Sequence, residues 1–342
     1  MKYSIIVPTY NRLEEIKELI ESLDAMSKHA DCPAFQLIVI DDGSTDSTVS
    51  FLQDYIETKS GIPIEYYSQS NKGPGAARNY GMSVAKGDYF IFVDSDCLIP
   101  EDYLAKIDHF IENKKPEAFG GPDTFHPSFS PLLKAINYSM TSFIGTGGTR
   151  GKKNGIGKFY PRSFNMGFKK EVFGKIGGFN ALRHGQDMDY SARIYEAGYH
   201  VQLIPDAFVY HKRRTSLKKF FKQIFNWGIA RVNLSKLHKG FLKPVHLAPA
   251  ILVIASIVFL GLLGIGILPK LGSYLLVMPI LIALVAFFQA YKMYRSLPIA
   301  CLSIITLFIQ VFAYGLGTLS GIFQLQILRK EETKGFIKNY YK

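Results

Sequence analysis

Two carboxylates that stand one residue apart, directly after an apolar run, are the part of the sequence best suited to chemistry. Asp94 and Asp96 follow residues 89–93, a run typical of a strand that is buried on both faces of a sheet. Carboxylates are costly to bury without partners, so both must lie at the carboxyl edge of this strand. Two aspartates in one turn can reach a single hard divalent cation. The pattern therefore predicts a cation site, and an ordinary aspartate turn is the alternative.

Two earlier strands are expected to bring more polar groups to the same edge. Segments 3–7 and 35–40 are apolar, and each is followed by a polar loop and then by helical periodicity. The loops are Pro8-Thr9-Tyr10-Asn11 and Asp41-Asp42-Gly43-Ser44. Helix capping would explain one acid of the second loop but not the whole group.

A third strand over 62–67 leads into the small-residue segment 71–81. Lys72 and Arg78 offer positive charge near the start of a helix, where anions are favoured. Because parallel strands joined by right-handed crossovers point the same way, the three polar loops 8–11, 41–44 and 94–96 are expected at one edge of the sheet.

The middle of the chain has a weaker pattern. A helix is expected over 101–113, and the glycine-rich segment 145–157 is interpreted as a mobile lid whose contact with substrate stays open. Gln186 and Asp187 precede a helix, where negative charge in the first turn is favoured. His211 stands at the end of a short strand and is followed by three basic residues.

The composition divides the 342-residue chain at about residue 240. The first part is typical of a soluble α/β protein, and the last part is almost continuously apolar. The net charge of +12 is concentrated between them, because Asp206 is the single acid of residues 206–246 against ten basic residues. A basic block before an apolar one favours anionic lipid headgroups over nucleic acid as a partner. The three cysteines lack metal or disulfide spacing and indicate a reducing compartment, and no secretory leader is expected.

The apolar part predicts membrane helices. Residues 213–246 carry apolar residues at helical spacing among lysines, which is typical of basic amphipathic helices at a membrane interface, with packing against the catalytic domain as another use of that face. Residues 247–268 and 271–291 are each long enough to cross a bilayer. A third span is expected over about 299–320. It would place the basic tail 329–342 outside, against the positive-inside tendency, unless the glycines near 315–321 break the segment.

Five spaced motifs together resemble family 2 glycosyltransferases of the GT-A fold. They cover about residues 3–230 and are Pro8-Thr9-Tyr10-Asn11, Asp41-Asp42-Gly43-Ser44, Asn71-Lys72-Gly73 with Ala77-Arg78-Asn79, Asp94-Ser95-Asp96 and Gly185-Gln186-Asp187. The resemblance implies a Rossmann-like, mostly parallel sheet flanked by helices, followed here by an α-helical transmembrane region. It also implies inverting transfer from a nucleoside diphosphate sugar, with UDP the expected nucleotide, and a Mg²⁺ or Mn²⁺ ion that holds the diphosphate.

The resemblance also assigns roles to residues. Asp187 matches the family's catalytic base, which takes a proton from the acceptor hydroxyl. Asp96 would bind the metal directly, with Asp94 and His211 as further candidates. The expected nucleotide-binding residues are Pro8, Thr9, Tyr10, Asn11, Asp42, Lys72, Arg78, Asp94 and Ser95. The residues expected at the acceptor or the diphosphate are Gln186, Arg213, Arg214, Gln223, Trp227 and Arg231.

Two positions depart from the family pattern. Gln186 stands where the family usually has a glutamate before the catalytic aspartate, so acceptor binding is expected to differ. Gln223 and Trp227 resemble the Q-x-x-R-W motif of membrane polysaccharide synthases, but Asn226 replaces the arginine and Arg231 would have to compensate. This departure argues against processive synthesis.

The sequence therefore predicts a membrane-bound glycosyltransferase that acts on a lipid-linked or glycan acceptor for surface polysaccharide. The expected organisation is a cytoplasmic catalytic domain over 1–212, interface helices over 213–246, a transmembrane region over 247–328 and a basic tail over 329–342. The expected location is the inner membrane of a bacterium, with several crossings, because nucleotide sugars are made in the cytoplasm. A processive synthase and a non-catalytic nucleotide-sugar-binding scaffold are the alternatives.

Overall fold

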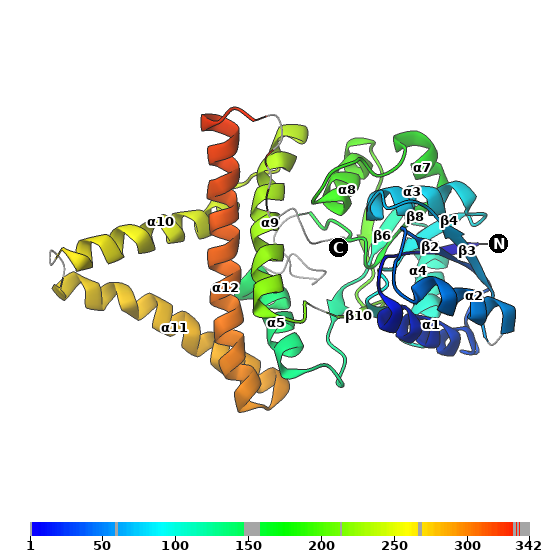
Figure 1. Cartoon of the computed structure of the whole chain (residues 1–342), viewed down its shortest axis with the longest axis horizontal. Helices are drawn as coiled ribbons and strands as arrows, with labels where there is room; N and C mark the ends of the chain where they lie inside the picture. Colours follow the sequence, from blue (N-terminus) through cyan, green and yellow to red (C-terminus); the bar gives the residue numbers. More distant parts are fainter. Residues whose placement is uncertain are drawn as a thin grey trace. The chain divides into compact units, whose positions relative to one another are not determined.

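The computed structural model describes residues 2–58, 61–146, 158–212, 214–265 and 269–330, together with Thr333 and Gly335; within it, the side chains of 269–276 are not described. The chain forms two compact units (Figure 1). The first consists of Met1–His126 and Gly148–Lys212, and the second of Pro127–Gly147 and Arg213–Tyr340.

The first unit is built on a seven-stranded, mostly parallel sheet, as expected. Its order is β3 (Ile64–Ser68), β2 (Phe35–Asp41), β1 (Tyr3–Thr9), β4 (Tyr89–Phe92), β8 (Met166–Lys169), β6 (Ala118–Gly120) and β9 (Val201–Leu203). Strands β3, β2, β1 and β4 are parallel, and β8 is antiparallel to both of its neighbours.

Helices connect the strands and cover both faces of the sheet. They are α1 (Leu13–Ser27), α2 (Thr48–Thr58), α3 (Pro74–Val84), α4 (Tyr103–Lys114), α7 (Lys170–Ile176) and α8 (Gln186–Glu196). A small second sheet has the order β5 (Cys97–Leu98), β10 (Val209–His211) and β7 (Asp123–Thr124).

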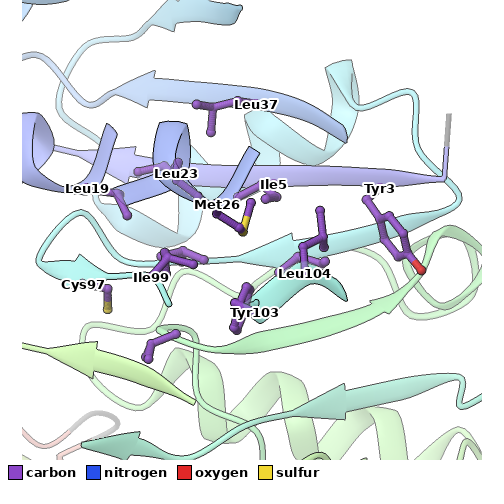
Figure 2. Packing of buried hydrophobic residues seen from close by; sticks show 14 of the residues in the cluster. Tyr3, Ile5, Leu19, Leu23, Met26, Leu37, Cys97, Ile99, Tyr103 and Leu104 are labelled. Atoms are coloured by element: carbon purple, nitrogen blue, oxygen red, sulfur yellow. The ribbon is translucent and has the colours of Figure 1, made fainter. Parts of the chain in front are cut away.

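The alternation of side chains along each strand divides the core into two layers. On β1, Ile5 belongs to the cluster under α1 and α4, whereas Ile6 belongs to the cluster on the other face. Figure 2 shows Leu19, Leu23 and Met26 of α1 over the strands of the first layer. Each fully buried aliphatic side chain of this kind contributes about 1.5–3 kcal/mol, so both faces hold the sheet rigidly.

The carboxyl ends of four neighbouring strands lie at one edge of the sheet. In the register, Thr9 pairs with Asp41, and Asp41 pairs with Ser68. On the other side of β1, Ile6 pairs with Phe92, two residues before Asp94. The prediction that the loops after these strands share one edge is confirmed.

The second unit is helical. It contains α5 (Pro131–Thr141), α6 (Phe143–Thr146), α9 (Leu217–Leu237), α10 (Pro244–Gly264), α11 (Pro269–Tyr294), α12 (Leu297–Ile322) and the π-helical turn η1 (Phe323–Ile327). Three segments of the described residues are long and apolar enough to cross a membrane, namely Pro244–Gly264, Val277–Tyr294 and Leu297–Ile327.

The division of the chain differs from the expected 1–212 domain. Pro127–Gly147 belongs to the second unit because α5 packs on α9 and α12, where Ile136 and Met140 contact the cluster around Phe220 and Ala313. Hydrogen bonds reinforce this contact, including Gln310 Nε2 to the carbonyl of Gly145 at 2.6 Å. Most of the predicted lid, residues 147–157, lies outside the described residues.

The alternative of a break near 315–321 is excluded, because α12 continues through these residues. The glycines serve close helix packing instead. A Cβ at Gly317 would lie 2.0 Å from the carbonyl oxygen of Phe225 on α9, and one at Gly315 would lie 2.4 Å from that of Pro249 on α10. Apolar residues of α9 pack in the same cluster as Ala313 of α12. The apolar face of α9, for which the sequence predicts contact with lipid or with the catalytic domain, is therefore covered by α12.

Candidate functional site

Asp42 fixes the loop between β3 and α3. Its carboxylate accepts hydrogen bonds from Gln69 Nε2 at 2.7 Å, from the backbone N–H of Lys72 at 2.9 Å and from that of Gly73 at 2.8 Å. Asp42 is also held to β1, because its own N–H donates to the carbonyl of Thr9. Asp42 therefore ties three segments of the sheet edge to the start of α3.

Asn11 organises the loop after β2. Its Oδ1 accepts hydrogen bonds from the N–H groups of Thr45 and Asp46, and its own N–H donates to Ser44 Oγ. Its backbone is left-handed, with φ of 50°, a conformation that asparagine tolerates better than most residues. Asn11 thus positions the predicted nucleotide loops through its own hydrogen bonds.

Arg78 of α3 reaches the first aspartate of the acidic pair. Arg78 Nη2 lies 2.6 Å from Asp94 Oδ1, and the guanidinium lies over the ring of Phe179, 5.6 Å from its centroid. Asn79 holds Phe179 in place with two hydrogen bonds to its backbone. Arg78 Nε and Thr9 Oγ1 are buried and have no hydrogen-bond partner among the described residues. Both atoms are therefore available to a polar ligand.

Asp96 lies between an arginine and a histidine. Its Oδ2 is 3.0 Å from Arg12 Nη1, and its Oδ1 is 3.3 Å from His211 Nε2. His211 Nδ1 in turn is 3.3 Å from Asp123 Oδ2, a carboxylate that can orient the ring. The Asp96 carboxylate raises the pKa of Arg12 above its ordinary value, so this guanidinium stays charged.

This group of side chains fits a divalent cation. Ligand atoms of Asp96, Cys97 and His211 lie within 4.8 Å of one another. Carboxylate oxygens suit Mg²⁺ and Mn²⁺, and the imidazole adds a nitrogen ligand. Burial and the nearby carboxylates raise the pKa of the Cys97 thiol well above its usual value, so the thiol stays protonated and is a poor ligand for a hard cation. The fitting donors are therefore Asp96 and His211, with Asp94 nearby.

Asp187 lies in the first turn of α8. Its Oδ1 accepts a hydrogen bond from the N–H of Met188, and its Oδ2 lies 3.6 Å from Arg162 Nη1. About a quarter of its side chain is exposed (23%), so the carboxylate can be reached by a substrate. Asp189, two residues further along α8, is buried, and its Oδ2 accepts hydrogen bonds from Asn180 and Arg193. Asp189 therefore stabilises the fold.

The first turns of α3 link three of these groups. Gly73 donates to Asp42, Arg78 pairs with Asp94, and Gly75 packs against Gln186, beside Asp187. Five residues of helix span about 7.5 Å, so these carboxylates surround one short piece of backbone. The geometry thus brings three of the predicted site residues, Asp42, Asp94 and Gln186, to the first turns of one helix.

The residues predicted at the acceptor or the diphosphate, other than Gln186, belong to the second unit, apart from Arg213, which lies outside the described residues. Pro8, Tyr10 and Ser95 belong to the first unit. Gln223 and Trp227 are on α9, and Trp227 packs with the cluster around Phe220. Arg231 lies over the ring of Phe241, 5.0 Å from its centroid. Asn226 is buried, and Gly335 packs against its side-chain oxygen. Arg214 and Ser216 precede α9, where Ser216 is the N-cap.

Several residues of the site were missed by the sequence analysis. Arg12 directly follows the motif 8–11, so its position in the loop was a usable signal. Arg162 and Asp123 lie where periodicity is weak, and only the folded chain brings them to Asp187 and His211. Gln69 and Phe179 act through Asp42 and Arg78, which no local pattern reveals.

His184, three residues before Asp187, is expected to make the stability of the folded chain depend on pH. Burial and the neighbouring charge of Arg183 lower the pKa of His184 from 6.5 to about 4. Between these values the unfolded chain binds the proton and the folded chain does not, so stability is full above pH 6.5 and falls toward pH 4. We expect the step from pH 7 to pH 5 to cost about 2 kcal/mol at this residue.

The measurement is the thermal unfolding temperature of the full chain at pH 7 and pH 5. His184→Gln should lose several degrees less than the wild type over this interval. His200→Gln, at an exposed histidine of the same unit, is the control and should behave like the wild type. Equal pH dependence in the wild type and His184→Gln would contradict the prediction.

Comparison with known proteins gives a family and several relatives. A family model described as "Glycosyl transferase family 2" matches residues 4–177, just over half of the chain. The Staphylococcus aureus poly(ribitol-phosphate) beta-N-acetylglucosaminyltransferase TarS is 37% identical over 114 residues, which are 33% of this chain and 19% of that protein. The Salmonella typhimurium O-antigen chain rhamnosyltransferase RfbN is 26% identical over 237 residues, which are 67% of this chain and 72% of that protein.

The fold also matches a solved structure over most of its length. The mannosyltransferase PcManGT from Pyrobaculum calidifontis, in complex with GDP-Man and Mn²⁺, has a TM-score of 0.64 and 20% sequence identity. The match covers 93% of this chain and 87% of that chain. By contrast, the matches to TarS and to a Bacillus spizizenii poly(ribitol-phosphate) beta-glucosyltransferase span only about a fifth of those proteins.

Proposed function

This chain belongs to glycosyl transferase family 2, and we propose that it moves a sugar, with inversion, from a nucleoside diphosphate sugar to a membrane-associated, lipid-linked acceptor in surface glycan synthesis. The observation that carries the proposal is the meeting of Asp42, Asp94 and Gln186, the neighbour of Asp187, around the start of α3. This arrangement supplies a nucleotide end and an acceptor end within one site.

The nucleotide end is formed by the sheet edge. Asp42 and the loop after β3 would hold the base and ribose, and the buried hydroxyl of Thr9 is a further donor or acceptor for them. Arg78 and the N-terminus of α3 favour the diphosphate, because a helix N-terminus attracts anions. We take UDP as the nucleotide, with GDP as the alternative to be tested.

The acceptor end is formed by α8. Asp187 would accept the proton of the acceptor hydroxyl while that oxygen attacks the anomeric carbon from the face opposite the leaving diphosphate. Asp96 and His211 would hold a Mg²⁺ or Mn²⁺ ion, which would neutralise the charge that develops on the diphosphate. Arg162, beside Asp187, would keep the carboxylate oriented toward the acceptor. No covalent intermediate is needed.

The comparisons support the classes of donor and acceptor. The name of RfbN describes sugar transfer on an O-antigen chain, and that of TarS describes transfer on poly(ribitol-phosphate). PcManGT was solved with a nucleotide sugar and Mn²⁺. The three apolar segments of this chain support an acceptor in a membrane. A bacterial inner membrane and a cytoplasmic catalytic unit follow from the proposal, since nucleotide sugars are made in the cytoplasm.

The experiment is a donor panel. Full-length protein in detergent, mixed with a bacterial lipid extract and Mn²⁺, is given labelled UDP- and GDP-sugars one at a time. One donor should release its nucleotide and transfer label to the organic phase. If no donor releases nucleotide above the level of Asp187→Asn, the transferase proposal fails and a nucleotide-binding scaffold becomes the better account.

Gly75→Ala gives a test of the acceptor side of the site. A Cβ at Gly75 would lie 2.6 Å from Gln186 Nε2, so the flexible end of Gln186 must move away. Alanine favours helix over glycine by about 1 kcal/mol, so the fold should not suffer. We expect KM for the acceptor to rise at least about fivefold and KM for the donor to stay within about twofold, which corresponds to a loss of about 1 kcal/mol at the acceptor alone.

The matched control for this variant is Gly174→Ala on α7. An added Cβ at Gly174 meets no atom within 4 Å, so both KM values should be unchanged. A parallel rise of the donor and acceptor KM values in Gly75→Ala would show that α3 as a whole has shifted, and would contradict a specific role of Gln186 at the acceptor.

A further inference from the structure

Helix α9 runs beside α12 in the same direction over a long contact. A Cβ at Gly317 would meet the carbonyl of Phe225, one at Gly228 would meet the backbone nitrogen of Thr318, and Gly321 packs on Val232. Residue numbers rise together on both helices along this contact. Because the two backbones approach so closely, α9 and α12 must lie at similar depths in any membrane.

The charges of α9 are spaced too closely for a membrane crossing. Lys222 and Arg231 are nine positions apart, which is about 13 Å along a helix at 1.5 Å per residue. The hydrocarbon core of a bilayer is about 30 Å thick, so both charges cannot reach water from a helix that crosses it. Lys218, Lys219 and Lys236 add charge at the two ends of α9. A position at the headgroup level satisfies all of these residues.

The first half of α12 is bound to α5 by polar groups. Thr306 Oγ1 lies 2.7 Å from Ser139 Oγ and also donates to the carbonyl of Ala135. Gln310 donates to the carbonyl of Gly145. Helix α5 carries Lys134, whose ammonium is exposed and bonded to the carbonyl of Pro127. The helices packed along both halves of α12 therefore carry charged groups.

The uncovered side of α12 is an apolar stripe. From Cys301 onward its exposed members recur at four-residue steps or pairs of such turns, and they are Cys301, Ile305, Phe312 and Leu316, followed by Phe323 of η1. The sequence from Leu297 to Leu328 has no charged residue. One apolar face along a helix whose other faces are covered by protein is the pattern of a helix that lies in the plane of a membrane interface.

Helices α10 and α11 are arranged differently. The buried residues of α10 are Ala250 and Val253, and α11 packs on α12 through Ala286, Ala290 and their neighbours. The remaining described lengths of both helices expose apolar side chains, and Figure 1 shows both helices leaving α12 and pointing away from it. Each is long enough to cross the hydrocarbon core.

We propose that α10 and α11 form a hairpin that crosses the membrane twice, and that α12 does not cross but lies along the membrane interface with α9 and α5. The exposed stripe of α12 then contacts the acyl chains, and the lysines of α9 face anionic headgroups. The expected third span at 299–320 is thereby reassigned as an interfacial helix.

The two-crossing arrangement also places most of the basic residues that flank these helices on one side, with Lys270 at the start of α11 as the exception. Lys243 precedes α10, Lys292 and Arg295 lie at the end of α11, and Arg329 and Lys330 follow α12. With two crossings all of these residues lie on the cytoplasmic side, as the positive-inside tendency requires. With three crossings Arg329 and Lys330 would lie outside.

Reporter fusions to the end of the full chain test the number of crossings. A fluorescent protein that folds only in the cytoplasm should be bright at the C-terminus, and alkaline phosphatase, which is active only outside, should be inactive there. The same two reporters inserted between α10 and α11 should give the opposite result. An active phosphatase at the C-terminus would overturn the proposal.

Spin-label depth tests the orientation of α12 itself. The native Cys301 and the variants Phe312→Cys and Phe323→Cys, the last two with Cys301→Ser and all with Cys32→Ser, are labelled in lipid nanodiscs. These sites are exposed, and each neighbouring pair is 11 positions, or about 16 Å, apart along the helix. We expect the three depths to agree within about 5 Å, with Ile257→Cys on α10 clearly deeper. A crossing helix would instead place Phe312 about 15 Å deeper than the other two and would overturn the proposal.

These measurements do not depend on catalysis. A chain that fails the donor panel can still show two crossings, and an active transferase can still show three, so the topology and the proposed function fail separately.

Discussion

Asp187→Asn is expected to lower kcat by about 10³-fold while leaving the affinity for UDP unchanged. Asparagine keeps the size of the side chain and can still accept the hydrogen bond from Met188, but it cannot take a proton. General base catalysis by a positioned side chain is worth about 10²- to 10⁴-fold, and the nucleotide end of the site is formed by other residues. Turnover of the donor found in the panel and calorimetric titration of UDP measure the two effects.

Glu196→Gln is the matched control for Asp187→Asn. Glu196 lies at the other end of α8 and is exposed, so the control changes the charge of the same helix away from its first turn. It should keep kcat within about twofold, or about 0.4 kcal/mol. If Asp187→Asn retains more than about a tenth of wild-type turnover, Asp187 is not the base and another proton acceptor must be sought.

Asp96→Asn is expected to lower turnover at least about 100-fold, which corresponds to about 2.7 kcal/mol of transition-state stabilisation. The amide removes the negative charge at the centre of the predicted cation site, while Arg12 keeps Glu15 and His211 keeps Asp123 as partners. The folded structure should therefore survive. The affinity for Mn²⁺ in the presence of UDP should fall by a similar factor of about 100. The electron paramagnetic resonance signal of free Mn²⁺, which is lost when the ion binds, measures this affinity.

Arg12→Ala should act on cation binding in the opposite direction. The guanidinium of Arg12 pairs with the same Asp96 carboxylate that the cation would use. Removing this positive charge should tighten Mn²⁺ binding to the nucleotide-free protein by about threefold or more, since even a partly exposed ion pair is worth up to about 1 kcal/mol. Asp102 pairs with Lys106 on α4, away from the predicted cation site. Asp102→Asn is therefore the control and should change neither turnover nor Mn²⁺ binding. Unchanged Mn²⁺ binding in Asp96→Asn would place the cation elsewhere.

The sheet and its functional edge could be predicted because their signals are local. Apolar runs followed by polar loops identified β1, β2 and β4, and the handedness of parallel connections brought the ends of these strands together. The roles of Asp42, Asp96 and Asp187 were implied by the resemblance to family 2 glycosyltransferases. The hydrogen bonds that hold Asp42 come from three separate segments, so its exact setting depended on the folded chain.

The partners of the predicted catalytic and metal-binding residues could not be predicted in the same way. Arg162 and Asp123 lie 25 and 88 residues from the groups they contact, and neither is in a periodic segment. The segment Pro127–Gly147 gave no sign that it joins the helical unit, because its contacts with α12 depend on Ser139 and Thr306, which are 167 residues apart. Contacts of this range depend on packing and not on sequence pattern.

Hydropathy alone does not decide the topology of the last apolar segment. The segment from 297 to 328 is apolar enough to cross a membrane, and its glycines suggested a break. The structure shows an unbroken helix whose glycines let α9 and α10 approach. Apolar length is shared by a crossing helix and by one that is covered by protein on one side, so neighbouring charges are needed to distinguish them.

The central claim is that one sheet edge holds a divalent cation and a nucleoside diphosphate together. The most direct measurement is calorimetric titration of UDP, and separately of GDP, into the full chain with and without Mn²⁺. We expect one of the two nucleotides to bind at least about tenfold more tightly with Mn²⁺, which corresponds to about 1.4 kcal/mol. Absence of binding by both nucleotides, or equal affinity with and without Mn²⁺, would contradict the account.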